Sequence, residues 1–304
     1  MVGRNILENN KVQNYIFLAP SKSELNLLDI NSVEKYIESN KPDIIIHCAG
    51  LVGGIQANIS NPVKFLTENF DIGKNVLISA NKYKVPRVLN LASSCIYPKD
   101  MSGHLTEQMI LTGPLEPTNE GYALAKISIL KLCEYINREN KNLNFKTIIP
   151  CNLYGRWDKF SDHNSHMLPA VIKKIHKAKV ENIKDVEIWG TGQAKREFMY
   201  CSDLVDFIFY ALENWTKIPE LVNVGLGEDY TINEYYSKVA HVIGYEGEFK
   251  HDLTKPEGMK RKVLDISSLR DLNWKAKTDL ENGIRNTYSF YLERMKNDIS
   301  TGNY

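Results

Sequence analysis

Two patterns of apolar residues alternate along the chain. Short continuous apolar runs predict buried strands, and longer segments with apolar residues at helical spacing predict helices. The runs occupy residues 15–19, 42–50, 87–94, 145–155 and 221–225, and the helical segments occupy residues 32–40, 62–84, 121–138, 202–214 and 231–244. Strands that alternate with helices in this way indicate an α/β protein whose parallel sheet is covered on both faces.

The order of these elements predicts a doubly wound sheet with the strand order 3-2-1-4-5. In that order residues 15–19 are the second strand and residues 42–50 are the third, while the first strand would lie upstream of Met1. We expect a domain boundary near residue 160. Residues 1–160 would bind the dinucleotide, and residues 161–304 would form a smaller α/β substrate domain, with some later segments returning to the first domain.

Composition and charge exclude several classes of protein. The 304 residues are 43% hydrophobic, which suffices for one large or two moderate cores, and the net charge of +1 argues against nucleic-acid partners and anionic membrane surfaces. We find no signal peptide and no apolar run near the ~20 residues that cross a bilayer. The five cysteines are odd in number and share no CxxC spacing, so we expect no disulfide framework, no metal site and a cytoplasmic location.

Candidate chemistry centres on residues 91–126. Tyr122 and Lys126 fall in a predicted helix at a spacing that puts both side chains on one face. We expect the lysine ammonium to lower the pKa of the tyrosine from its usual value of about 10, so that the phenol can exchange a proton with a substrate oxygen. Ser93, at the end of the run 87–94, can hydrogen-bond the same oxygen. An ordinary amphipathic helix also produces Tyr-x-x-x-Lys, but the serine-bearing strand favours catalysis.

Six motifs follow one another in a recognisable order. They are SSCIYPK (93–99), LEPTNEGYALAK (115–126), NLYG (152–155), NSHMLPA (164–170), WGTG (189–192) and KREF (195–198). Over nearly its whole length the chain resembles the GDP-L-fucose synthase family, an epimerase/reductase branch of the extended short-chain dehydrogenases. The resemblance implies a Rossmann-type fold and an enzyme that epimerises C3 and C5 of GDP-4-keto-6-deoxy-D-mannose and reduces C4 with NADPH to give GDP-L-fucose.

Alternative functions stay open beside this one. A close relative could act on another GDP-4-keto-deoxy sugar, of the colitose or deoxyheptose pathways, because no motif reports the shape of the sugar pocket. A non-catalytic paralogue is the alternative of another class, and the motif set argues against it.

The resemblance assigns catalytic roles to Ser93, Cys95, Tyr122, Lys126 and His166. Cys95 matches the base that removes protons next to the ketone, although a lone cysteine at a strand end is more often a packing residue. His166 matches the acid, and an imidazole with a pKa near 6.5 suits that role. His163 lies close in the sequence, but we expect it to be a surface histidine.

The resemblance also implies NADP(H) as the cofactor. Positions that match its binding residues are Gly3, Lys22, Asn26, Leu27, Ala49, Gly50, Tyr122, Lys126, Asn152, Leu153 and His166. Lys22 replaces an arginine that accommodates the 2′-phosphate, or else it is a solvated loop lysine. Gly3 matches the third glycine of a G-x-x-G-x-x-G fingerprint, unless it is a chance glycine. We therefore expect the natural chain to begin roughly a dozen residues earlier, and the chain from Met1 to bind NADPH poorly and to aggregate.

Substrate contacts are implied for Lys174, Trp189, Arg196 and Lys262. Arg196 can make a forked contact with phosphate oxygens, whereas Lys174 stands where the family often has an arginine and cannot fork in this way. Trp189 could instead be a core residue. The family further implies a homodimer through the helices near residues 62–84 and 121–138, which carry more apolar residues than one face of the sheet needs.

Overall fold

A computed structural model describes residues 1–161, 165–255 and 258–301, with side chains as far as residue 296. Its central sheet has four parallel strands, which are, in spatial order, β1 (Ile44–His47), β2 (Arg87–Leu91), β3 (Asn144–Pro150) and β8 (Leu221–Val224). The two middle strands are almost completely buried, as continuous apolar runs of a parallel sheet require. The predicted parallel sheet is therefore confirmed.

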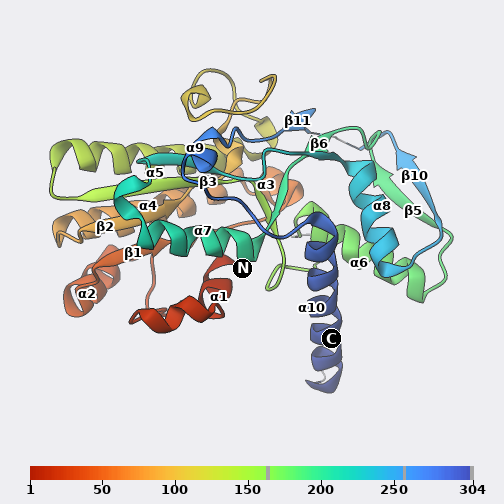
Figure 1. Ribbon diagram of the computed structural model, residues 1–304, viewed down its shortest axis with the longest axis horizontal. Coiled ribbons are helices and arrows are strands. Elements are labelled where there is room, and N and C mark those ends of the chain that lie inside the picture. Colours follow the sequence, from red (N-terminus) through yellow and green to blue (C-terminus); the bar gives the residue numbers. More distant parts are fainter. Residues whose placement is uncertain (162–164, 256–257, 302–304) are drawn as a thin grey trace.

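Helices cover both faces of this sheet (Figure 1). On one face, Val33, Leu77 and Ile129 pack with Val88 and Phe145 of the sheet in a shared core. A second core contains side chains of the helices on the opposite face. The first face carries α2 (Ile30–Asn40), α4 (Pro62–Lys82) and α5 (Glu120–Glu139), and the second carries α1 (Val2–Leu7) and α7 (Cys201–Glu213). The doubly wound arrangement is thus confirmed.

Residues 15–19 form no strand, so the prediction of a second strand there is wrong. The rings of Tyr15 and Phe17 instead pack against Phe209 of α7, and Ile16 is 96% exposed. A strand needs a neighbour that satisfies its backbone hydrogen bonds. Within the described residues, this segment pairs with no strand of the sheet.

The strand predicted to be third in the doubly wound order also lies elsewhere. It is β1, and it pairs directly with β2, where Ile45 lies beside Val88. The predicted order would instead have placed the first and second strands between these two. α3 (Ile55–Ser60) and α4 connect these two strands. Consecutive strands joined by a helical crossover usually lie side by side, so the local connection explains the observed neighbour.

A smaller lobe at the right of Figure 1 has its own core. Ile172, Ile188 and Tyr235 are among the side chains buried there. Gly244 ends one of its helices in the left-handed conformation at φ 72°, which a glycine at a helix end adopts without strain. The lobe contains the parallel pair β5 (Asp185–Trp189) and β10 (Glu248–Asp252), with α6 (Met167–Val180), α8 (Ile232–Ile243) and α10 (Leu280–Thr301).

Short elements complete the fold. Among the strands, β4 (Asn152–Tyr154) pairs with β7 (Phe198–Tyr200), and β6 (Lys195–Arg196) lies between β11 (Arg261–Lys262) and β9 (Tyr230–Thr231). The short helices are α9 (Ser267–Asp271) and the 3-10 turns η1 (Asn10–Asn14), η2 (Ser94–Ile96), η3 (Glu107–Met109), η4 (Pro117–Asn119) and η5 (Trp215–Lys217). Two of the four predicted substrate residues, Arg196 and Lys262, lie in two-residue strands.

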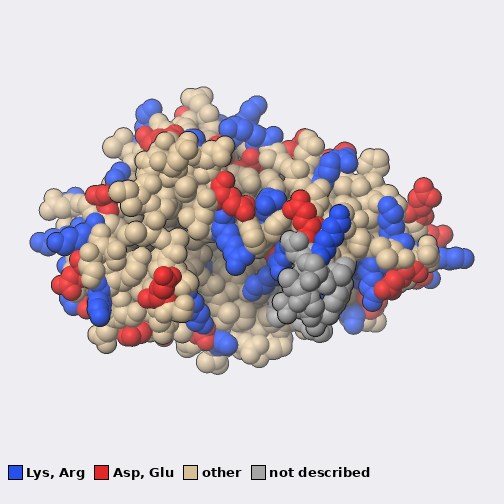
Figure 2. Space-filling view, turned by 90° about the horizontal axis from the view of Figure 1, so that it is seen from below, with Lys and Arg blue, Asp and Glu red and all other residues tan. Residues whose placement is uncertain are grey.

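The surface carries both signs of charge. Figure 2 shows lysine and arginine side chains interspersed with aspartate and glutamate across the face seen from below, in keeping with the net charge of +1. Of the helices in the described part of the chain, none combines the length and the apolar character that crossing a bilayer requires.

Candidate active site

The chain turns sharply just after β2. Ser93 caps the short turn η2, and its hydroxyl accepts a hydrogen bond from the backbone N–H of Cys95 at 3.5 Å. Cys95 is only 7% exposed. A hydroxyl and a thiol are therefore held together at the carboxyl end of a parallel strand, the edge at which ligands bind in open α/β sheets.

The first turns of α5 lie against this strand end. Lys126 Nζ donates a hydrogen bond to the carbonyl oxygen of Leu91 at 2.9 Å, and it lies 5.8 Å from the ring centroid of Tyr122. Both side chains are on one side of α5, as their spacing predicts. Because the ammonium is bonded to the last residue of β2, the helix and the strand end are held together. The fold thus unites the two groups of predicted catalytic residues.

The pKa of Tyr122 is raised above its usual value, so the prediction that Lys126 lowers it is wrong. Burial is the main cause, because a phenolate is poorly solvated inside the protein. A thiolate at Cys95 would raise the pKa further, and a hydrogen bond with Ser93 acts in the opposite direction. Burial lowers the pKa of Lys126 itself to about 8. Tyr122 therefore keeps its proton near neutral pH and is suited to donate it.

Cys95 and His166 share one cationic neighbour. Burial raises the pKa of the Cys95 thiol, and the ammonium of Lys262 is the largest influence in the opposite direction. His166 directly precedes α6, and its pKa is lowered by burial and then by the charges of Lys159 and Lys262. Lys262 thus acts on both predicted proton-transfer groups. His163 lies outside the described residues.

Gly50 lies so close to Asn69 and Lys126 that only a residue without a Cβ fits there. A Cβ at this position would stand 2.9 Å from Asn69 Oδ1 and 3.7 Å from Lys126 Nζ. Ala49, which is half-buried, precedes it just after β1. Small residues at this strand end keep the backbone accessible close to the lysine, as the approach of a bulky cofactor requires.

Asn152 and Leu153 lie in β4, directly after the sheet strand β3. Both are half-buried, and Asn152 Nδ2 donates to the carbonyl oxygen of Glu197 at 2.8 Å. This hydrogen bond fixes the asparagine to the junction of β6 and β7.

The remaining predicted dinucleotide residues lie on the N-terminal segments. Gly3 is in α1, where an added Cβ would be 3.5 Å from its nearest neighbour, an ordinary contact. Lys22 and Asn26 are exposed on the loop before α2, and the carbonyl of Leu27 is bonded to α4 at 2.9 Å. Gly3 thus lies beside Cys48, which follows β1, and Leu27 lies against α4.

The predicted substrate residues form two pairs. Lys174 Nζ donates to the backbone oxygen of Glu187 at 2.6 Å, and Trp189 Nε1 donates to the carboxylate of the same residue at 2.9 Å. Trp189 is 42% exposed, which rules out a core role. Arg196 and Lys262 are directly paired residues of β6 and β11. Two cations thus stand side by side, and one of them, Lys262, acts electrostatically on Cys95.

The sequence did not single out two residues that contact this site. Lys159 Nζ donates to the backbone oxygen of Val52 at 3.2 Å and acts electrostatically on His166. Glu197 is a buried carboxylate next to Arg196. The KREF motif contains that glutamate and was the available signal, whereas no motif pointed to the lysine.

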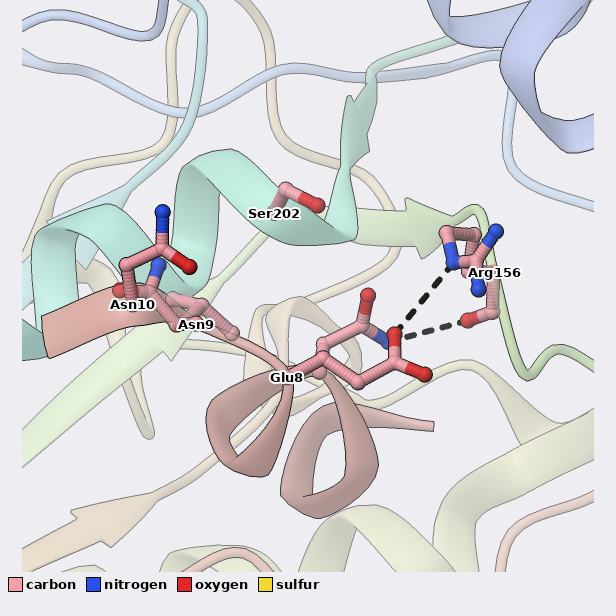
Figure 3. Close-up of a pocket in the computed structure, with 7 residues that line it drawn as sticks. Glu8, Asn9, Asn10, Arg156 and Ser202 are labelled. Carbon is pink, nitrogen blue, oxygen red and sulfur yellow. Dashed lines mark hydrogen bonds and ion pairs between the residues drawn. The ribbon is translucent and has the colours of Figure 1, made fainter. Parts of the chain in front are cut away.

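A cavity of about 470 Å³ opens elsewhere, between α1, η1 and the start of α7 (Figure 3). Its polar lining includes Asn9, Asn10 and Ser202, and Arg156 Nε is bonded to Glu8 across it at 3.3 Å. None of the predicted site residues lines it. The predicted catalytic residues therefore lie at the end of β2 and not at this cavity.

Comparison with known proteins agrees with this architecture. Residues 1–225 match the model of the NAD dependent epimerase/dehydratase family. The chain is 55% identical to a GDP-L-colitose synthase of Yersinia pseudotuberculosis, covering 98% of this chain and 97% of that protein. It is 48% identical to a GDP-L-fucose synthase of Azorhizobium caulinodans, covering 96% and 93%. The solved structure of a GDP-mannoheptose C4 reductase from Campylobacter jejuni with NADP bound superposes with a TM-score of 0.86 at 29% identity, covering 96% and 95%. The chain belongs to the NAD dependent epimerase/dehydratase family.

Proposed function

We propose that this protein epimerises C3 and C5 of GDP-4-keto-6-deoxy-D-mannose and reduces C4 with NADPH, giving GDP-L-fucose. The observation that carries the proposal is the cluster of Ser93, Cys95 and Tyr122 at the end of β2, with Lys126 bonded to Leu91. The 48% identity to a GDP-L-fucose synthase along 96% of the chain supports it.

NADP(H) is the proposed cofactor. Gly50 is exposed and has no side chain, so a dinucleotide could approach the backbone there, near Lys126, and a related reductase has been solved with NADP bound. When bound, NADPH supplies the hydride that reduces the ketone. Residues proposed to hold it are Gly3, Lys22, Asn26, Leu27, Ala49, Gly50, Tyr122, Lys126, Asn152, Leu153 and His166.

Epimerisation would use groups on two sides of the sugar. Cys95 Sγ takes a proton from the carbon next to the ketone, and the electron pair of the broken C–H bond moves to the ketone oxygen. Hydrogen bonds from Tyr122 and Ser93 stabilise the charge on that oxygen. The electron pair then moves back from the oxygen to the carbon, which takes a proton from His166 on its opposite face and is thereby inverted.

Reduction would then use Tyr122 as an acid. Its raised pKa keeps the phenol protonated, so a proton is ready for the C4 oxygen when that oxygen gains negative charge. Lys126 carries a positive charge below a pKa of about 8 and stands beside the ring, where it favours transfer of the proton away from the phenol.

The nucleotide would lie toward the smaller lobe. Arg196 and Lys262, on adjacent strands, supply positive charge for the diphosphate. Trp189 offers an exposed ring face for stacking, and Lys174 supplies a further cation. This arrangement supports the division into a dinucleotide-binding domain of residues 1–160 and a mainly sugar-nucleotide-binding domain of residues 161–304.

We also propose a homodimer through α4 and α5, in the cytoplasm. Val63, Leu66 and Phe70 are exposed on α4 at helical spacing, and Leu124 and Tyr135 are exposed on α5. Such a stripe is typical of a helix that packs against a partner. A monomeric mass in solution at micromolar concentration would contradict the dimer.

A second candidate substrate is the GDP-4-keto-deoxy sugar precursor of GDP-L-colitose, which the 55% identity to a GDP-L-colitose synthase favours. Deoxyheptose precursors are a further candidate, supported by the 29% identity to the heptose reductase. A non-catalytic role stays the alternative of another class.

The deciding experiment mixes the protein with NADPH and each GDP-4-keto sugar in turn. The loss of NADPH absorbance is followed, and the product is identified by its NMR spectrum. We expect kcat/KM to be highest for GDP-4-keto-6-deoxy-D-mannose. A higher value for the colitose precursor would reassign the substrate, and no oxidation by well-folded protein would reject the enzyme.

A further inference from the structure

Glu197 is a buried carboxylate that the proposed reaction leaves without a role. It is 1% exposed and accepts hydrogen bonds from the backbone N–H groups of Leu226, of Gly227 at 2.8 Å and of Leu264 at 2.8 Å. A Cβ at Gly225 would lie 2.4 Å from its Oε1, so the backbone comes close enough only because this residue is a glycine. Hydrogen bonds from amides to a carboxylate are among the strong ones in proteins.

These contacts join segments that are distant in the sequence. Glu197 stands between β6 and β7, residues 226–227 follow the sheet strand β8, and Leu264 follows β11. β11 has two residues, so few backbone hydrogen bonds hold it against β6. At the start of β11, Arg261 Nε forms an ion pair with the carboxylate of Asp229 at 2.6 Å. Two carboxylates therefore help to hold β11, together with the backbone hydrogen bonds that join Val263 and Asp265 to Leu105 at 2.9 Å each.

The residue that β11 brings to the site is Lys262. Within the described part of the chain, its ammonium has no hydrogen-bond acceptor or ion-pair partner. It lies close enough to Cys95 for the two charges to influence one another, and it is paired in register with Arg196. Its position relative to the thiol thus depends on β11 and not on a bond of its own.

We propose that Glu197 is a positioning residue that holds β11, and with it the ammonium of Lys262, in the place from which this charge favours the Cys95 thiolate. The inference rests on the proposed function, in which Cys95 is the base. The charged and titratable groups that act on Cys95 are Lys262 from β11 and Lys126 and Tyr122 from α5. Displacing β11 would remove one of the two cations among them.

The test measures the reactivity of Cys95 directly. The full chain, without NADPH or sugar, is alkylated with iodoacetamide across a range of pH, and mass spectrometry follows the peptide that carries Cys95. The rate follows the thiolate fraction. We expect Glu197→Gln and Lys262→Met each to raise the midpoint of the curve of alkylation rate against pH by about one pH unit. At a fixed pH below the midpoint, the alkylation rate should then fall about tenfold. Lys262→Arg should keep the midpoint close to that of the unmodified protein.

Asp203 provides a matched control. It is a carboxylate that is 4% exposed and accepts backbone hydrogen bonds from Lys277 and Thr278 at 3.2 and 3.1 Å, but it is not among the groups that act on Cys95. We expect Asp203→Asn to lower stability without moving the Cys95 midpoint. An equal shift in this variant would mean that general loosening, and not β11, controls the thiol.

Other outcomes decide the proposal as well. If Glu197→Gln does not fold, Arg261→Gln loosens β11 from the side of Asp229 and should raise the midpoint in the same direction. An unchanged midpoint in Lys262→Met, or in both Glu197→Gln and Arg261→Gln, would overturn the inference. Alkylation needs no turnover, so a protein that shows these shifts but reduces no GDP-4-keto sugar would refute the proposed reaction alone.

Discussion

The two ends of the candidate site are built differently. At the sheet end, Tyr122 and Lys126 lie on a helix of 20 residues that packs on the core, and Lys126 is bonded to buried β2. At the other end, Arg196 and Lys262 lie on strands of two residues that buried Glu197 holds in place. Core packing positions the proton-transfer groups, whereas a few polar contacts position the cations. Different substitutions should therefore impair the functions of the two ends.

The largest effect is expected at the sheet end. Tyr122→Phe removes the proton donor while keeping the ring, so it should lower the rate of C4 reduction by about 10²–10⁴ with little change in melting temperature. Single-turnover oxidation of NADPH measures the rate. Tyr97→Phe is the control, because the Tyr97 hydroxyl is bonded to Asn223 at 2.6 Å in the core. If Tyr97→Phe lost as much activity at equal stability, Tyr122 would have no special role.

The pH dependence of stability tests Lys126. Its folded-state pKa of about 8 lies below the usual 10.5, so between these values the unfolded chain binds more protons than the folded one. The free energy of unfolding should therefore rise with pH across this window, by up to about 3 kcal/mol. Denaturant unfolding at several pH values measures it. Lys126→Met should lack this part of the rise, and identical pH profiles would contradict the assignment.

Glu197, at the other end, should show the opposite dependence. Burial raises its pKa from 4.5 to about 7, so between these values the folded protein holds a proton that the unfolded chain has released. The free energy of unfolding should fall as pH rises through this window, by up to about 3 kcal/mol. The comparison is with Glu197→Gln, which cannot titrate. A fall of equal size in that variant would assign the effect to other groups.

The smallest effect is expected at Arg196. Arg196→Lys keeps the charge but loses the forked geometry for phosphate oxygens, so KM for the GDP sugar should rise about tenfold, since contacts to charged groups contribute roughly 1.5 kcal/mol or more. The value of kcat should change little. Steady-state kinetics separates the two constants. A fall in kcat at constant KM would instead connect this residue with the proton-transfer end.

Local sequence patterns predicted much of the sheet end. Apolar runs predicted β1, β2, β3 and β8, and helical spacing predicted α4 and α5 with Tyr122 and Lys126 on one side. The prediction of a strand at residues 15–19 was wrong, because an apolar run forms a strand only beside a neighbouring strand that hydrogen-bonds to its backbone. The predicted place of β1 in the sheet was wrong for a related reason. Which strands pair depends on the connections between segments and not on the pattern within one segment.

What the sequence by itself determined is local: which segments are strands or helices, and which side chains share a face, because both follow from the 2.0 and 3.6 residue periods. What only the tertiary structure decided is the environment of each charge. Burial reversed the expected pKa shift of Tyr122, and Glu197 is bonded to Leu264, which is 67 residues away in the chain. Solvation and long-range contacts set the energy of a charge, and no short pattern of residues encodes either.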